Sequence, residues 1–243
     1  MAEIKLIALD MDGTLLNSDE EVSEYTKETI AKALEKNVRV VLSTGRWLGS
    51  CYPYAEALNL KSDLITCNGG EIWTINKELV ERHLFDEEKM NAMYEIARTL
   101  GMFTWMVATD RIFYDEKPDD LSSYAWLKFG CATTDKKVLD EFIEQISYFE
   151  GLELTNSMPL NVEINPKGVN KANALRRVCR DLGLTMDQVM AAGDSLNDIK
   201  MIQEAGVGVA MGNAQEAIKK AADYITDTND NDGVAKAIEK FVL

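Results

Sequence analysis

The run Ile4–Leu9 ends in the tetrapeptide Asp10-Met11-Asp12-Gly13. A near-continuous apolar run that stops at a turn is typical of a buried parallel strand. Two carboxylates at the carboxyl end of such a strand are costly to desolvate without a partner. Open α/β sheets bind their ligands at this end of their strands. We therefore expect Asp10 and Asp12 to face a cation, and the cation to face a substrate.

Strand-like and helical segments alternate in the first and last thirds of the chain, which predicts βαβ units around a parallel sheet. The expected strands are Ile4–Asp10, Val38–Thr44, Asp63–Asn68, Val189–Asp194, Val207–Met211 and Tyr224–Thr226. The expected helices are Val22–Lys36, Trp47–Leu58, Lys171–Leu182, Asp198–Glu204, Ala214–Ala222 and Val234–Phe241. The predicted fold class is α/β, with a Rossmann-like parallel-sheet core.

The middle of the chain follows a different pattern, in which hairpins accompany helices. The expected hairpin strands are Glu71–Ile75 with Leu79–Leu84 and Phe103–Val107 with Arg111–Tyr114. The expected helices are Glu87–Leu100 and Lys136–Ile146, and two further strands are Leu152–Thr155 and Asn161–Ile164. This mixture predicts a smaller α+β domain inserted into the α/β domain. We expect residues 1–84 and 167–243 to form the core domain and residues 85–166 to form the inserted domain.

The chain is acidic, with a formal net charge of −15. This charge argues against nucleic acid or an anionic membrane as a partner. It also repels phosphate, so a phosphate-binding site in this chain needs local positive charge, which a bound Mg²⁺ supplies. Oligomeric state is left open by the sequence.

The four cysteines are widely scattered and include no CxxC pair. No apolar run approaches the length of a membrane span, and the chain enters its first strand without a signal-peptide pattern. We therefore expect a cytoplasmic protein with reduced thiols.

Four segments that carry polar side chains are expected to meet in one crevice. Asp10 and Asp12 end the first strand, Ser43–Arg46 end the second, and Gly193–Asp198 follow the strand of the last third. These three segments lie at the carboxyl ends of adjacent parallel strands, while Lys171 opens the helix after the insertion. All four can therefore face one ligand.

The residue types at these positions suit phosphoryl transfer. Asp10 and Asp194 would supply the oxygen ligands that Mg²⁺ prefers. The hydroxyl and free backbone N–H groups at Thr44 and Gly45 can hold phosphate oxygens, and Lys171 adds a compact positive charge. Asp10 can also attack phosphorus to form an aspartyl-phosphate. Asp12 could then protonate the leaving oxygen and later activate water.

The order of these segments resembles the haloacid dehalogenase superfamily. Asp10–Leu15 is similar to the first motif of that family, Ser43–Arg46 to the second, Lys171 to the third and Gly193–Asp198 to the fourth. An insertion between the second and third motifs resembles a type C2 cap, and its hairpins resemble the C2B caps of Cof-like phosphatases. The turn Asn68-Gly69-Gly70 also resembles that group.

The resemblance implies a role for each matching residue. Asp10 would be the nucleophile and a metal ligand, and Asp12 the general acid/base and a ligand through its backbone carbonyl. The remaining roles are phosphate binding by Met11, Thr44, Gly45, Lys171 and Asn197, metal binding by Asp194, support by Asp198, and substrate contacts by Arg46 and Asn68. The implied activity is a Mg²⁺-dependent phosphatase of small phosphorylated metabolites, with sugar phosphates as the expected class.

Two other functions fit the same motifs. A sugar phosphomutase would return the phosphoryl group to a sugar instead of transferring it to water. A non-catalytic phosphometabolite-binding regulator would bind the same compounds without turnover, although such a protein could have lost Asp10 or Asp12 and this chain keeps both.

The segment Thr228–Gly233 nearly matches a calcium loop but starts with Thr and follows a strand. We interpret it as an acidic turn that caps the last helix.

Overall fold

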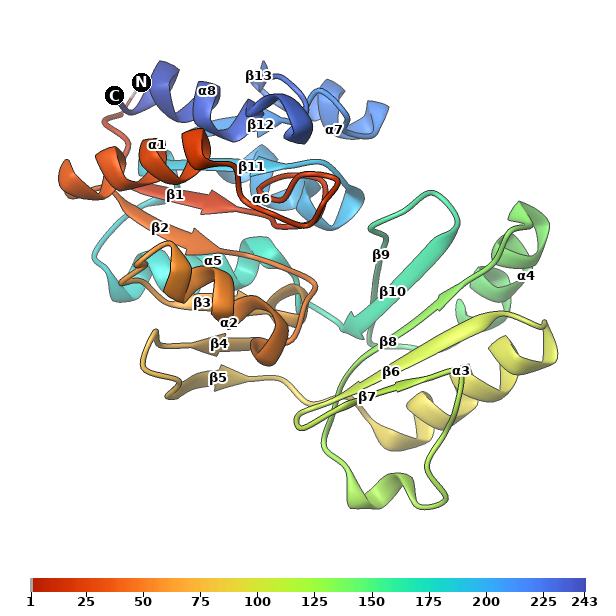
Figure 1. Ribbon diagram of the computed structural model, residues 1–243. Helices are drawn as coiled ribbons and strands as arrows, with labels where there is room; N and C mark the ends of the chain where they lie inside the picture. Colours follow the sequence, from red (N-terminus) through yellow and green to blue (C-terminus); the bar gives the residue numbers. More distant parts are fainter. Residues whose placement is uncertain (1) are drawn as a thin grey trace. The chain divides into compact units, whose positions relative to one another are not determined.

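The computed structural model describes residues 2–243, and the chain divides into two compact units (Figure 1). One unit combines the residues up to Glu81 with Asn170–Leu243, and the other contains Arg82–Val169. The edges expected from the sequence were 84/85 and 166/167. The second unit is therefore an insertion within the sequence of the first.

The first unit is built on a five-stranded sheet. Its strands are β1 (Leu6–Leu9), β2 (Arg39–Leu42), β11 (Val189–Gly193), β12 (Val207–Ala210) and β13 (Tyr224–Ile225). Their order is β13-β12-β11-β1-β2, and all neighbours run parallel. Strand β1 has β2 on one side and β11 on the other, so the strand order reverses beside it. Such a switch point leaves a crevice at the carboxyl ends of the strands.

Helices cover both faces of this sheet. They are α1 (Glu24–Glu35), α2 (Leu48–Ala57), α5 (Lys171–Asp181), α6 (Ile199–Glu204), α7 (Glu216–Ala221) and α8 (Gly233–Phe241). On one face, Ile7 and Leu9 share a buried cluster with residues of α1 and α8, which lie side by side (Figure 1). On the other face, Leu6 and Ala8 share a cluster with α5. Burial on both faces explains why β1 reads as a continuous apolar run.

The third expected strand belongs to a separate sheet. That sheet contains β3 (Leu64–Thr66), β4 (Glu71–Trp73) and β5 (Leu79–Arg82), and β3 pairs antiparallel with β4. A single parallel bridge, Ser43 to Ile65, joins β3 to the segment after β2. Cys67, Asn68 and Gly69 all have positive φ, so the chain reverses directly after β3. This reversal leads directly into β4, so β3 pairs with β4 and has only that one bridge toward the five-stranded sheet among the described residues.

The second unit is an antiparallel sheet covered on one face by two helices. Its elements are α3 (Glu87–Thr99), β6 (Phe103–Ala108), β7 (Ile112–Tyr114), β8 (Trp126–Ala132), α4 (Lys136–Ile146), β9 (Leu152–Thr155) and β10 (Asn161–Pro166). The strand order is β7-β6-β8-β10-β9. Met93 of α3 and Phe142 of α4 pack in one cluster with Phe129 and Ile164 of the sheet. The predicted fold class, a parallel α/β core with an inserted α+β unit, is confirmed.

The central strand β8 was not predicted, because Lys128 and Gly130 interrupt its apolar pattern. Lys128 is buried and its Nζ lies 3.2 Å from Oε2 of Glu163 on β10. Gly130 lies under Trp105 of β6, whose ring would be 2.1 Å from an added Cβ. Both residues are therefore explained by partners on neighbouring strands, which local sequence does not reveal.

The acidic turn before α8 does not cap that helix as predicted. Asp232 occupies the N-cap position with φ 58°, but its carboxylate makes no cap hydrogen bond. It accepts a hydrogen bond from Ser23 Oγ at 2.5 Å instead. The positive φ directs the side chain away from the helix end and toward the segment before α1.

No helix among residues 2–243 combines the length and the apolar character that a membrane span requires.

Truncating the core of the second unit should destabilise the protein. Phe142 is fully buried in its cluster, so Phe142→Ala should lower the free energy of unfolding by about 3–5 kcal/mol. Tyr148 is 81% exposed, and Tyr148→Ala should change it by less than about 0.5 kcal/mol. Urea denaturation of both variants checks this, and equal losses would contradict the packing described.

Candidate active site

The side chain of Lys171 is the centre of the site. Helix α5 begins at Lys171, and the preceding Asn170 caps it by accepting a hydrogen bond from Asn173 N. Lys171 Nζ donates to Asp10 Oδ1 at 2.6 Å and to Asp198 Oδ1 at 2.7 Å, and the lysine is completely buried. Asp10 directly follows β1, and Asp198 lies in the turn after β11. The ammonium therefore joins two strand ends to one helix start.

Asp198 is held in place by the turn that carries it. Its Oδ2 accepts hydrogen bonds from the backbone N–H groups of Asp194 and Ser195, both at 3.1 Å. A Cβ on Gly193 would lie 2.4 Å from the Asp198 side chain, so this turn requires glycine. Both oxygens of Asp198 are thus bound to protein groups, and the residue can support the site without contacting a ligand.

Three carboxylates lie close together, and the ammonium of Lys171 binds two of them. Oxygens of Asp10, Asp194 and Asp198 lie within 4.8 Å of one another. Asp194 also accepts hydrogen bonds from Ser195 Oγ at 2.8 Å and from Thr14 Oγ1 at 3.3 Å. The cluster keeps excess negative charge after Lys171 is counted, and a set of hard oxygen donors of this kind suits Mg²⁺. Asp10 and Asp194 are the residues whose oxygens would hold it.

Burial and crowding change the protonation of this cluster. Burial raises the pKa of Asp10 well above its usual range, the charge of Asp198 adds to this, and Lys171 opposes it. Burial, together with the charge of Asp198, raises the pKa of Asp194 to about 6. For Lys171 burial favours the neutral form, but the charges of Asp10 and Asp198 outweigh it and leave its pKa raised. A bound cation would return the carboxylates to their ionised form.

A second group of residues, Thr44, Asn68 and Asn197, is joined by hydrogen bonds of backbone and side-chain amide groups. Thr44 follows β2, and its carbonyl accepts a hydrogen bond from Asn68 N at 2.9 Å. The Asn68 side chain in turn accepts one from Asn197 Nδ2 at 3.3 Å. Asn68 has φ 59° and is almost fully buried. Among the described residues, the N–H of Met11 finds no hydrogen-bond acceptor, so it is available to a ligand.

Gly69 fixes this second group to the start of α5. Its φ is 95°, and an added Cβ would lie 2.6 Å from the carbonyl oxygen of Asn170. The turn at Asn68-Gly69 therefore contacts both the segment after β2 and the residue that precedes Lys171. This packing brings the second and third predicted motifs together.

Asp12 has a different environment from Asp10. Its carboxylate lies against the Arg46 guanidinium, with Nε at 2.9 Å from Oδ2 and Nη2 at 2.5 Å from Oδ1. The Asp12 side chain is 54% exposed, whereas that of Asp10 is 6% exposed. The sequence predicted Arg46 as a substrate contact and did not predict this ion pair. Two carboxylates two residues apart thus have separate partners.

The structure places every predicted site residue at the carboxyl edge of the parallel sheet. These are Asp10, Met11, Asp12, Thr44, Gly45, Arg46, Asn68, Lys171, Asp194, Asn197 and Asp198. Sequence reasoning missed Thr14 and Ser195 as hydrogen-bond donors to Asp194. Both lie inside the predicted motifs, Thr14 two residues after Asp12 and Ser195 directly after Asp194. This proximity was the signal that the sequence offered.

Comparisons with known proteins agree with this geometry. A family model described as haloacid dehalogenase-like hydrolase matches residues 7–129 and 118–238. The chain is 49% identical over 241 residues to 5-amino-6-(5-phospho-D-ribitylamino)uracil phosphatase YcsE of Bacillus subtilis, covering 99% of this chain and 97% of the relative. A solved haloacid dehalogenase-like hydrolase from B. subtilis matches with a TM-score of 0.89 and 27% identity, covering 99% of this chain and 100% of that one. The solved subclass IIB sugar phosphatase BT4131 matches with a TM-score of 0.85 and 25% identity, each chain covered to 98%.

The raised pKa of Asp194 predicts a pH-dependent response to Mg²⁺. Asp194 has a pKa of 3.8 in the unfolded chain and about 6 in the folded protein, so the folded state favours the protonated acid. Without a cation, the contribution of Asp194 to stability therefore falls as the pH rises through this range. A cation reverses that loss by binding the ionised form. Mg²⁺ should therefore raise the melting temperature more at pH about 7.5 than at pH about 5.

Thermal denaturation with and without MgCl₂ at the two pH values checks this prediction. Asp194→Asn should remove most of the difference, because the amide neither titrates nor supplies the anionic oxygen that would hold the cation. An equal rise in melting temperature at both pH values would contradict it.

Proposed function

The chain belongs to the haloacid dehalogenase-like hydrolases, and on that basis we propose that it is a Mg²⁺-dependent phosphatase that forms an aspartyl-phosphate on Asp10. The observation that carries the proposal is the cluster at the switch point of the sheet, in which the half-buried Asp194 lies beside the buried side chains of Asp10, Asp198 and Lys171. A carboxylate in this position can attack phosphorus while the neighbouring ammonium offsets negative charge on the phosphoryl oxygens. Bound Mg²⁺ would supply further charge stabilisation for the same oxygens.

In the first step, an oxygen of Asp10 bonds to phosphorus and the bond from phosphorus to the leaving oxygen breaks. Asp12 enters this step protonated and gives its proton to that oxygen, so that an alcohol leaves and Asp12 becomes the carboxylate. Arg46 binds the carboxyl group of Asp12, and the negative charge of the phosphate would compete for the guanidinium and loosen this pair. Lys171, Thr44, Gly45, Asn197 and the N–H of Met11 would hold the phosphoryl oxygens.

In the second step, water attacks the phosphorus of the aspartyl-phosphate. Asp12 takes the proton from the water, and the bond between phosphorus and the Asp10 oxygen breaks. Phosphate leaves and both carboxylates return to their starting forms. Neither step requires histidine, and the chain has a single one, His83, which lies in the second unit.

For the substrate, we take the relative with 49% identity as the guide. That protein is a phosphatase of 5-amino-6-(5-phospho-D-ribitylamino)uracil, a phosphorylated sugar alcohol joined to a uracil. We infer that this chain hydrolyses the same compound, and that the unit Arg82–Val169 is a cap that selects the leaving group. The four buried, disulfide-free cysteines support the cytoplasmic location that such a metabolite requires.

Phosphate release from a panel of this compound and several sugar phosphates tests the substrate. We expect the highest kcat/KM for 5-amino-6-(5-phospho-D-ribitylamino)uracil. A higher value for a sugar phosphate would overturn the substrate assignment while leaving the phosphatase activity standing. Phosphate release only when a sugar acceptor is added would favour the phosphomutase.

Replacing the nucleophile should abolish turnover. Asp10→Asn keeps the shape of the side chain but removes the attacking oxygen charge, so kcat should fall by at least about 1,000-fold. Asp140→Asn provides a matched control, because Asp140 pairs with Lys136 on the exposed face of α4. Steady-state phosphate release measures both, and retained activity in Asp10→Asn would refute the assignment of the nucleophile.

A further inference from the structure

The turn that follows Asp12 is tightly closed. Thr14 N and Leu16 N both donate to the carbonyl oxygen of Met11, at 3.2 and 2.9 Å. Gly13 has φ 75°, and an added Cβ would lie 2.8 Å from Asp194 Oδ2. The turn at residues 13–16 therefore rests directly on a carboxylate of the buried cluster.

Two asparagines distant in the sequence hold this turn from its other side. Asn213 Nδ2 donates to the carbonyl of Gly13 at 2.8 Å, and Asn229 Nδ2 donates to the carbonyl of Leu16 at 2.9 Å. The two are linked, because Asn229 N donates to Asn213 Oδ1 at 3.0 Å. We call this pair the asparagine clamp. It spans the turn from its first carbonyl to its last.

The asparagine clamp is itself fixed to the strand ends. In the loop that carries Asn213, Met211 N donates to Gly193 O at 3.1 Å and Gln215 N donates to Asp194 O at 2.9 Å. The clamp thus connects the turn after Asp12 to the segment that bears Asp194. A shift of either segment has to break hydrogen bonds of the clamp.

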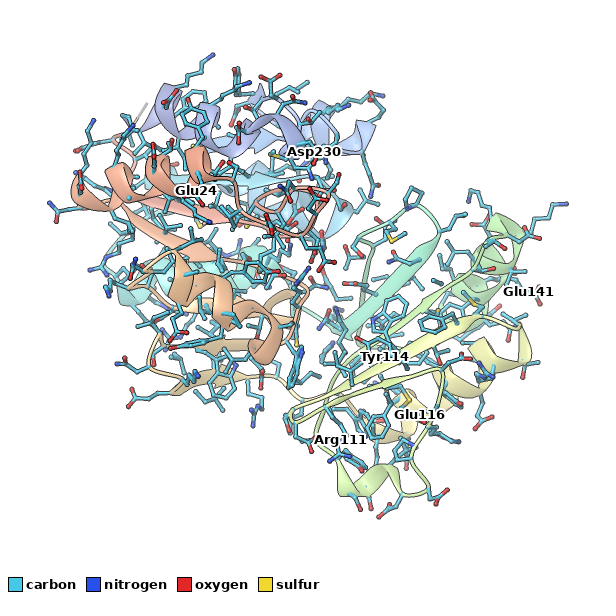
Figure 2. All side chains as sticks on the ribbon, viewed as in Figure 1. Glu24, Arg111, Tyr114, Glu116, Glu141 and Asp230 are labelled. Carbon is cyan, nitrogen blue, oxygen red and sulfur yellow. The ribbon has the colours of Figure 1, made fainter. Side chains whose placement is uncertain are left out.

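The acidic turn before α8 extends the same contacts. Asp230, labelled in Figure 2, accepts hydrogen bonds from both the N–H and the hydroxyl of Ser18 at 2.7 Å. Asp232 accepts one from Ser23. The carboxylates that resemble part of a calcium loop are therefore occupied by the segment that follows the turn.

We propose that Asn213 and Asn229 are positioning residues that hold Asp12 where it can transfer a proton. The inference rests on the proposed function, in which Asp12 is the general acid/base. Asp10 has further supports, because its N–H donates to Ala192 O at 3.1 Å and its carboxylate binds Lys171 at 2.6 Å, so loss of the clamp should displace Asp12 more than Asp10.

The peptide between Gly13 and Thr14 explains how the clamp acts on Asp12. Its carbonyl is held by Asn213 and its N–H by the carbonyl of Met11. With the carbonyl released, this peptide can rotate, and the rotation is passed through Gly13 to Asp12. Proton transfer requires hydrogen-bond distance to the reacting oxygen, and displacements of about 1 Å cost orders of magnitude in rate.

The test compares two substrates that differ in their need for a proton. Ribose 5-phosphate has a poor leaving group that must be protonated, whereas 2,4-dinitrophenyl phosphate has one that leaves unaided. In Asn213→Ala and Asn229→Ala, kcat/KM for ribose 5-phosphate should fall by about 10–100-fold, part of the usual contribution of general acid catalysis. The first-turnover release of dinitrophenolate should change by less than about 3-fold, because Asp10 alone carries that step.

Matched variants separate positioning from loss of structure. Asn231→Ala is the control, because Asn231 Nδ2 donates only to Thr228 Oγ1 in its own turn, and this variant should retain both activities. Asn213→Asp keeps the size and the acceptor of Asn213 but removes the donor to Gly13, so it should behave like Asn213→Ala. It also carries the test if the alanine variant fails to fold.

Hydrogen exchange of the peptide that spans residues 10–17 gives a readout independent of activity. Exchange should become faster in Asn213→Ala and Asn229→Ala and stay unchanged in Asn231→Ala. Equal losses on both substrates, or unchanged exchange in the clamp variants, would overturn the positioning role. A wild-type protein inactive on both substrates would instead contradict the proposed function.

Discussion

The buried ammonium of Lys171 and the carboxylates of Asp10 and Asp198 compensate one another's charge in a site that excludes water. All three side chains are almost completely excluded from solvent. Desolvation costs several kcal/mol per ion, and removal of one partner from such a group typically costs about 3–5 kcal/mol. The end of β1, the turn after β11 and the start of α5 are consequently held at fixed positions. A third carboxylate, Asp194, lies within the same cluster and leaves it with unbalanced negative charge.

That excess negative charge indicates that the cluster binds a cation and does not serve only to stabilise the fold. A structural ion pair would balance its charges, whereas this cluster raises the pKa of Asp194 to about 6. Asp12, two residues from Asp10, lies outside this cluster and pairs with Arg46 instead. The separation of the two environments suits the two roles that we propose, attack by the buried carboxylate and proton transfer by the exposed one.

The sequence predicted the parallel core because it depends on local signals, and the candidate site residues followed from strand ends and from the resemblance of four motifs to a known family. Strand β1 is apolar on both faces, and the polar residues follow directly at its end. Strand β8 was not predicted, because Lys128 and Gly130 are explained only by partners that lie on other strands. The ion pair of Asp12 with Arg46 was hidden for a similar reason, since residue types alone do not reveal the direction of a side chain. Asn213 and Asn229 lie in turns without periodic patterns, so only their contacts reveal them.

In the proposed mechanism, Asp10 carries the phosphoryl group during turnover. The most direct measurement is mass spectrometry of Asp12→Asn protein, quenched in acid during reaction with 2,4-dinitrophenyl phosphate and Mg²⁺. This variant still permits attack by Asp10, because the leaving group needs no proton, but it lacks the base that activates water. We expect a phosphate to accumulate on the peptide that contains Asp10. Release of dinitrophenolate with no phosphorylated peptide, or with the phosphate on another residue, would contradict it.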